Sequence, residues 1–201
     1  MKQAYHHKDL RNALIDEALS VLASGGSGEI TLRELSRRLG VTHTAPYAHF
    51  ADKLALLEAV ANVGFERLAA LLEGAASEDD PVKALSAMGS AYLGFAQENP
   101  NLYRLMFADP ELADDPHCEL GPAGERAFGA LMHGLQRIGV PAGTDPRDLS
   151  AAVWSLVHGA VMLELDRRMN GKTMRSAEEV LRLGIFLVLR GLREGNGKSA
   201  N

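Results

Sequence analysis

Side chains that can form hydrogen bonds to a nucleic acid gather in one short run between positions 42 and 50 of the chain. Threonine and histidine both donate and accept hydrogen bonds, and the methyl groups of threonine and alanine can contact the methyl group of thymine. The candidate contact residues of these types, together with one tyrosine, are Thr42, His43, Thr44, Ala45, Tyr47 and His49. This composition suits contact with base edges and phosphates.

The elements around this run must present it at a surface. Thr31 and Glu34, three residues later, match a capping box that opens a helix. An apolar stripe of leucines follows at helical spacing, at Leu32, Leu35 and Leu39. Gly40 then stands where a helix ends most easily in the left-handed conformation. The pattern predicts a helix-turn-helix whose second helix is presented outward. An ordinary helical hairpin within an all-α core is the alternative.

Proline interrupts the expected second helix. Pro46 has no N–H to donate, and it disfavours helix at the preceding residue. Either Thr42 or Thr44 can be the N-cap, and in both cases we expect a short or tightened helix. Asp52 is placed to cap a third, longer helix, with Lys53 just inside it.

Three pieces of this stretch carry a resemblance to a known family. They read T-x-R-E-L-S-R-R-L-G-V from Thr31, T-H-T-A-P-Y-A-H-F from Thr42 and A-D-K-x-x-L-L from Ala51. Together they resemble the DNA-binding domain of the TetR family of bacterial transcriptional regulators. Pro46 is a departure, because commoner members have leucine at this position.

The resemblance implies a role for each matching residue. Tyr47, His49 and Lys53 would contact the DNA backbone. The residues at the start of the second helix would face base edges, namely Thr42, His43, Thr44 and Ala45. Phe50 would lock this helix into the core.

Charge and composition set limits on the class of protein. The net charge is −5, but the first 60 residues hold seven basic and seven acidic residues and are neutral. DNA binding would therefore be driven only modestly by counterion release. A single cysteine excludes a disulfide within one chain. The start of the chain lacks an apolar signal core, and no apolar run fits a membrane span, so we expect a cytoplasmic protein.

The pattern of the whole chain predicts an all-α fold with two domains. Residues 1–52 would form a three-helix DNA-binding domain, with a bridging helix over about 52–73. Residues 74–201 would form a helical ligand-binding and dimerisation domain. Its expected helices cover residues 81–98, 101–107, 122–138, 145–169 and 176–193.

The last two of these helices are apolar almost all round, which indicates a partner beyond the core of their own domain. We expect a homodimer through a four-helix bundle, two helices from each subunit. The predicted contact residues are Val157, Val161, Leu165, Leu183, Phe186, Leu187 and Arg190. Complete burial of both helices inside one monomer is the alternative.

The piece W-x-x-x-H-G, from Trp154 to Gly159, resembles a C-terminal domain of one TetR subgroup. Trp154 and His158 lie four residues apart on one helix face and could line an apolar pocket for a hydrophobic or aromatic small molecule. The full set of predicted pocket residues is Tyr92, Phe95, Tyr103, Met106, Met132, Trp154, His158 and Met162. A plain core with a satisfied histidine is the alternative.

The sequence contains no HExxH, paired Cys-x-x-Cys, phosphate-binding glycine loop or G-x-S-x-G. We therefore predict no enzyme, no metal and no cofactor. The predicted function is a homodimeric DNA-binding transcriptional regulator, a repressor that binds a palindromic operator and is released by a small hydrophobic or aromatic effector. A helical scaffold or interaction protein is the alternative.

Overall fold

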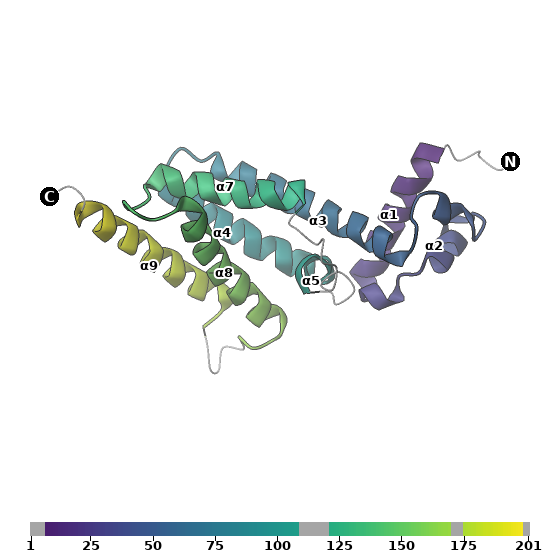
Figure 1. The fold of residues 1–201 in the computed structure, drawn as a ribbon. Coiled ribbons are helices and arrows are strands. Elements are labelled where there is room, and N and C mark those ends of the chain that lie inside the picture. Colours follow the sequence, from purple (N-terminus) through teal and green to yellow (C-terminus); the bar gives the residue numbers. More distant parts are fainter. Residues whose placement is uncertain (1–6, 109–120, 170–174, 199–201) are drawn as a thin grey trace. The chain divides into compact units, whose positions relative to one another are not determined.

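Helices make up every regular element in the part of the chain that the computed structural model describes, residues 7–108, 121–169 and 175–198 (Figure 1). The elements are α1 (His7–Ser24), η1 (Ser27–Glu29), α2 (Leu32–Leu39), η2 (Ala45–Ala48), α3 (Lys53–Ala76), α4 (Pro81–Glu98), α5 (Pro100–Ala108), α7 (Pro122–Ile138), α8 (Pro146–Leu165) and α9 (Ala177–Lys198), where η denotes a 3-10 helix. The predicted all-α fold is confirmed.

The chain divides into two compact units. The first contains residues 1–65 and 99–121, and the second contains residues 66–98 and 122–201. Helix α3 contributes to both. This division differs from the predicted one because α5 packs against α1 in the first unit, where the Asn101 side-chain amide donates to the carbonyl of Leu22 at 2.8 Å.

The local signals around α2 form as the sequence predicts. The Glu34 N–H donates to the Thr31 hydroxyl at 3.2 Å, which caps the start of the helix. Gly40 has φ 67° and ψ 25°, and the following Val41 N–H donates to the carbonyl of Ser36 at 3.0 Å. The left-handed glycine therefore closes the helix and redirects the chain toward η2.

The first unit has a buried apolar core and a close crossing of α3 and α5. Fully buried side chains include Leu14, Leu22, Ile30, Leu35, Leu56 and Leu57. Helix α5 approaches α3 at Gly64, where a Cβ atom would lie 2.5 Å from Met106 Sδ. The rings of Phe65 and Phe107 meet edge to face beside it, with centroids 5.2 Å apart. The absence of a side chain at Gly64 therefore lets α5 lie directly on α3.

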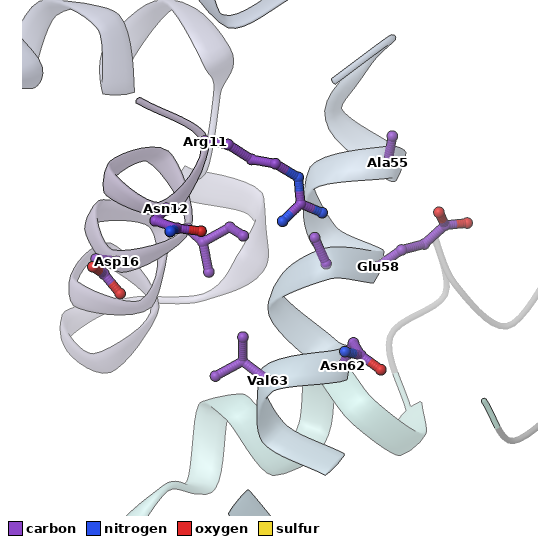
Figure 2. A pocket seen from close by; sticks show the side chains of 9 residues that line it. Arg11, Asn12, Asp16, Ala55, Glu58, Asn62 and Val63 are labelled. Atoms are coloured by element: carbon purple, nitrogen blue, oxygen red, sulfur yellow. The ribbon is translucent and has the colours of Figure 1, made fainter. Parts of the chain in front are cut away.

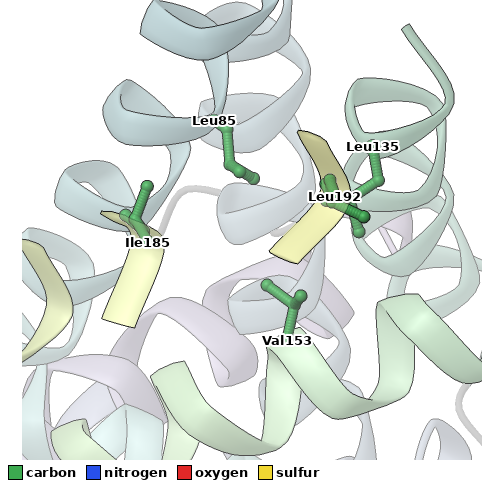
Figure 3. Close-up of a cluster of buried hydrophobic side chains, with 5 residues drawn as sticks. All are labelled: Leu85, Leu135, Val153, Ile185 and Leu192. Atoms are coloured by element: carbon green, nitrogen blue, oxygen red, sulfur yellow. The ribbon is translucent and has the colours of Figure 1, made fainter. Parts of the chain in front are cut away.

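The second unit packs α4, α7, α8 and α9 around a shared core. Each of these helices contributes to the buried cluster in Figure 3, which consists of Leu85, Leu135, Val153, Ile185 and Leu192. The end of α3 is attached to α7 by arginines. Arg126 binds Glu73 through two hydrogen bonds and Glu66 through a third, and Arg137 donates to carbonyls at the end of α3 and just after it.

Two helix ends differ from the prediction. Helix α8 ends at Leu165 rather than near residue 169, because Arg167 adopts a positive φ of 56° that no helix continues through. Helix α9 extends past the predicted end at Arg193. The pair between Arg190 and Glu194, at 2.8 Å and one helical turn apart, supports this extra length.

The conformation of Gly40 gives a test of the α2 turn. Replacing Gly40 with Ala introduces no clash, since nothing lies within 4 Å of the added Cβ. The left-handed backbone alone should lower the free energy of unfolding by about 1 kcal/mol. The control is Gly74→Ala, an exposed helical position with open space, which should raise it by about 0.5 kcal/mol. Equal effects in a urea titration would contradict the assigned conformation.

Candidate nucleic-acid interface and ligand cluster

The segment expected to face DNA is a single turn of 3-10 helix rather than a regular α-helix. Its backbone N–H groups donate three residues back, from Ala45 to Thr42 at 3.0 Å, from Tyr47 to Thr44 at 3.2 Å and from His49 to Pro46 at 2.9 Å. Thr44 occupies the N-cap position, but its side chain makes no capping bond. The short, tightened helix predicted from Pro46 is thus what forms.

Burial separates this turn into an outer and an inner side. Thr42, His43, Thr44 and Tyr47 are exposed, and the Tyr47 side chain is 57 % exposed. Ala45, His49 and Lys53 are partly buried. Pro46 and Phe50 point inward, and the Arg11 guanidinium lies 5.3 Å from the centre of the Phe50 ring. Phe50 therefore anchors the turn as predicted, while the polar side chains are left at the surface.

Two of the three arginines of α2, Arg37 and Arg38, are already engaged by carboxylates. Glu34 accepts hydrogen bonds from Arg37 and Arg38, and Arg38 also reaches Glu17 at 3.2 Å. The hydrogen bonds from Arg37 and Arg38 lower the pKa of Glu34 to about 2. The carboxylate therefore stays ionised near neutral pH and offsets part of the positive charge that α2 could offer to a phosphate. Lys53, at the start of α3, gains importance as a cation next to the turn.

A groove of about 630 Å³ lies between α1 and α3 within the first unit (Figure 2). Small and apolar residues line it together with charged and amide side chains. The charged lining residues are Arg11, Asp16 and Glu58. Two carboxylates against one guanidinium disfavour a phosphate here. The exposed turn of η2 is the better candidate for contact with a nucleic acid.

In the second unit, three of the predicted pocket residues meet in one hydrogen-bonded cluster. The Trp154 Nε1–H donates to the Tyr92 hydroxyl oxygen at 3.0 Å, and that hydroxyl lies 3.2 Å from His158 Nδ1. Burial lowers the pKa of His158, which favours the neutral imidazole. Tyr92 comes from α4, while Trp154 and His158 come from successive turns of α8.

The remaining predicted pocket residues do not all join this cluster. Phe95 is buried, and Met132 and Met162 are half-buried in the second unit, whereas Tyr103 and Met106 are buried in the first. Phe128 of α7, which is not among the predicted pocket residues, packs against Trp154 with ring centroids 5.3 Å apart. The Arg147 guanidinium also lies 5.1 Å from the centre of the Phe128 ring. Phe128 is therefore an additional member of the aromatic cluster.

Comparisons with known proteins assign this architecture. Residues 14–60 match the family described as bacterial regulatory proteins, tetR family. Residues 85–186 match the tetracyclin repressor-like C-terminal domain, which covers α8 and its Trp154–Gly159 motif. The chain belongs to the TetR family. The predicted resemblance is confirmed, and with it the class of DNA-binding transcriptional regulator; membership of a subgroup marked by W-x-x-x-H-G stays a prediction.

Individual relatives support the TetR assignment. The nucleoid occlusion factor SlmA of Aliivibrio fischeri is 33 % identical over 100 residues, which is 45 % of this chain and 50 % of that protein. The uncharacterized HTH-type transcriptional regulator TtgW of Pseudomonas putida is 42 % identical over 59 residues, or 29 % of this chain and 44 % of that one. The chain spans about half the length of the curated relatives it matches.

A solved structure extends the similarity to nearly the full chain. A protein of unknown function from Rhodococcus sp. RHA1 is 30 % identical, with a TM-score of 0.75. The match covers 95 % of this chain and 99 % of that chain. The two units of this TetR family member are therefore found together in another protein of similar length.

Within the second unit, α8 and α9 share an exposed apolar face. Leu183, Phe186 and Leu187 of α9 are 51 %, 59 % and 55 % exposed. A Cβ atom at Gly184 would lie 2.7 Å from Leu156 Cδ2, so Leu156 of α8 packs directly beside these residues. We call Leu156, Leu163, Leu183, Phe186 and Leu187 the α8–α9 apolar face.

The predicted dimer residues fall partly on this face. Leu183, Phe186, Leu187 and Arg190 are exposed, and Leu165 is half-buried. The prediction that Val157 and Val161 contact a partner subunit is corrected, because they are 8 % and 0 % exposed and lie in the interior of their own chain. Leu156 and Leu163 are the exposed leucines of α8 instead. Because the sequence of α8 is apolar almost throughout, it did not reveal which of its side chains are exposed.

Helix α8 is also long and apolar enough to resemble a membrane span, the only such helix among the described residues. Its most apolar 18-residue stretch has a mean hydropathy of 1.2, and 28 % of that stretch is buried. One such helix is weak evidence for a membrane span, since a core helix meets the same measure. Its exposed leucines lie on the α8–α9 apolar face, where a partner helix would cover them equally well.

Proposed function

We propose that this chain represses transcription by binding a palindromic DNA operator as a homodimer, and that a small apolar or aromatic effector releases it. The observation that carries the proposal is the exposed polar turn from Thr42 to Tyr47, held from beneath by buried Pro46 and Phe50. A turn of this kind can enter the major groove, where hydroxyl and imidazole groups distinguish base pairs. Two turns related by a twofold axis would read two half-sites about one helical turn apart.

In this proposal the residues divide by task. Thr42, His43, Thr44 and Ala45 face base edges. Tyr47, His49 and Lys53 contact the phosphate backbone on either side. Because Glu34 engages Arg37 and Arg38, two guanidinium groups of α2 are partly neutralised, and each phosphate contact at the turn carries a correspondingly larger share of the affinity.

DNA binding is tested with the purified full chain and the DNA that flanks its own coding region, titrated at several salt concentrations against random DNA. Tight, saturable binding at two protomers per site is expected. Lys53→Ala should weaken binding to every sequence and reduce the salt slope by about one. Lys83→Ala, which removes an exposed lysine of α4, serves as the matched control and should change neither.

Two results would contradict this assignment. A loss of affinity in Lys53→Ala that depends on base sequence would remove the phosphate role of that lysine. Binding no tighter than to random DNA, both here and in a selection from random sequences, would overturn DNA regulation and favour a helical scaffold.

The homodimer is proposed to form through the α8–α9 apolar face. Leucine and phenylalanine side chains about half exposed on adjacent helices form the kind of patch that marks a protein interface. Packing against the same face of a second copy would give a four-helix bundle, two helices from each subunit. Arg190, exposed at the edge of this face and paired with Glu194, fits the polar rim of such an interface.

Phe186→Glu should disrupt this dimer, because it would bury a carboxylate of each subunit in the interface. We expect the dimer dissociation constant to rise about 30-fold or more, as for loss of a hot spot of about 2 kcal/mol. Leu71→Glu, at a 47 % exposed position of α3, is the control for adding charge to an exposed apolar site. Sedimentation velocity over a range of concentrations measures both. A Phe186→Glu protein that stays as dimeric as the control would place the interface elsewhere.

The effector is proposed to bind at the cluster of Phe128, Trp154, Tyr92 and His158. Its rings offer apolar contact, while the hydroxyl and imidazole can orient one polar group of the ligand. The ligand would shift α5, and the close contact of Met106 with Gly64 would pass that motion to α3. The dimer would have two states, one in which the spacing of the DNA-reading turns fits the operator and one in which it does not. The ligand releases the DNA only if it binds the second state more tightly.

The single tryptophan makes this site directly observable. Aromatic compounds that release the operator should also change Trp154 fluorescence with the same concentration dependence. Trp154→Ala should raise the effector concentration needed for release about tenfold or more, while operator affinity stays within twofold. Simultaneous loss of folding and DNA binding would instead identify Trp154 as a core residue.

A further inference from the structure

The backbone of the DNA-reading turn is set by one residue that cannot donate a hydrogen bond. Pro46 is buried, and it stands at the start of a helix that would otherwise be free to wind with bonds four residues back. Instead the N–H groups of Ala45, Tyr47 and His49 each donate three residues back. These three bonds are of the 3-10 type, whereas the Phe50 N–H, just after the turn, donates four residues back to the Pro46 carbonyl at 3.0 Å.

This backbone changes which side chains share a face. In an α-helix, residues three apart differ by about 60° around the axis. In a 3-10 helix they eclipse one another, with a rise of about 2 Å per residue. The bond from the Tyr47 N–H to the Thr44 carbonyl, at 3.2 Å, joins such a pair, and both residues are exposed. Thr44 and Tyr47 thus lie on one outward line, about 6 Å apart along the axis.

We propose that Pro46 makes Tyr47 a specificity-determining residue, which reads a base edge together with Thr44 rather than gripping the phosphate backbone. The inference rests on the proposed DNA binding and revises the role of one residue within it. If Thr44 reaches a base edge, Tyr47 points the same way. A separation of about 6 Å spans nearly two base-pair steps of about 3.4 Å each.

The chemistry of the pair fits this role. The Tyr47 phenol both donates and accepts a hydrogen bond, and with 57 % of the side chain exposed its ring can also contact a thymine methyl group. Phosphate contacts by contrast carry no sequence information. The two roles of Tyr47 therefore predict different effects of removing the hydroxyl.

The test is a selection from random double-stranded DNA with the full-length protein and with Tyr47→Phe. Relative affinities are then measured for each single base change in the selected site and for random DNA. We expect Tyr47→Phe to lose at least fivefold discrimination at one or two base pairs of each half-site. Its affinity for random DNA should stay within twofold of the parent.

Two variants at position 46 test the backbone cause. Pro46→Ala and Pro46→Leu both restore the N–H, but they differ in side-chain volume. A shared change of base preference at the positions that Tyr47→Phe affects would therefore come from the backbone rather than from packing. Thermal melts identify any variant that fails to fold, and the exposed position of Tyr47 keeps the Tyr47→Phe arm interpretable in that case.

Distinct results separate failure of the inference from failure of the proposed function. If Tyr47→Phe weakens all sequences equally, Tyr47 is a phosphate contact and the inference is wrong while DNA regulation stands. If both position 46 variants fold and keep the parent's base preference, Pro46 does not set specificity. If the parent selects no sequence, both the proposed function and the inference fall.

Discussion

In our proposal, the missing N–H of Pro46 is the constraint on which the shape of the turn from Thr42 to His49 depends. Without that donor the segment winds as a 3-10 turn. The Pro46 carbonyl accepts hydrogen bonds from the N–H groups of both His49 and Phe50, at 2.9 and 3.0 Å. Phe50 is 3 % exposed and is covered by the guanidinium of Arg11. Two buried residues therefore hold in place a set of small polar side chains that have little packing of their own.

Signals confined to a few neighbouring residues could be predicted from the sequence. Asp80 and Asp145 accept N–H donors two residues ahead at 2.8 and 2.7 Å, and Ser176 and Glu179 form both halves of a capping box. Gly40 takes the positive φ that its position requires. These interactions are local, so the start of a helix is encoded where it occurs. The end of α8 was placed too late because it depends on a positive φ at Arg167, a residue type that seldom adopts one.

Contacts between distant segments could not be read in the same way. Helix α8 is apolar around most of its circumference, so periodicity could not show that Val157 and Val161 face inward and Leu156 and Leu163 outward. The cluster of Trp154, Tyr92 and Phe128 joins three helices, and only the pairing of Trp154 with His158 lies within one of them. Residue types suggested the members, but the sequence held no signal for their geometry.

Under the proposed function, charge makes DNA binding depend on dimerisation. The first 60 residues are neutral overall, and Glu34 offsets Arg37 and Arg38 on α2, so a single unit would gain little from counterion release. The two DNA-binding domains of a dimer bind with their combined affinity only if their spacing matches the operator. Weak attraction of each domain to DNA therefore makes the affinity of the dimer sensitive to that spacing. A ligand that alters it by a small amount would then be enough to release the DNA, whereas a strongly basic domain would stay bound.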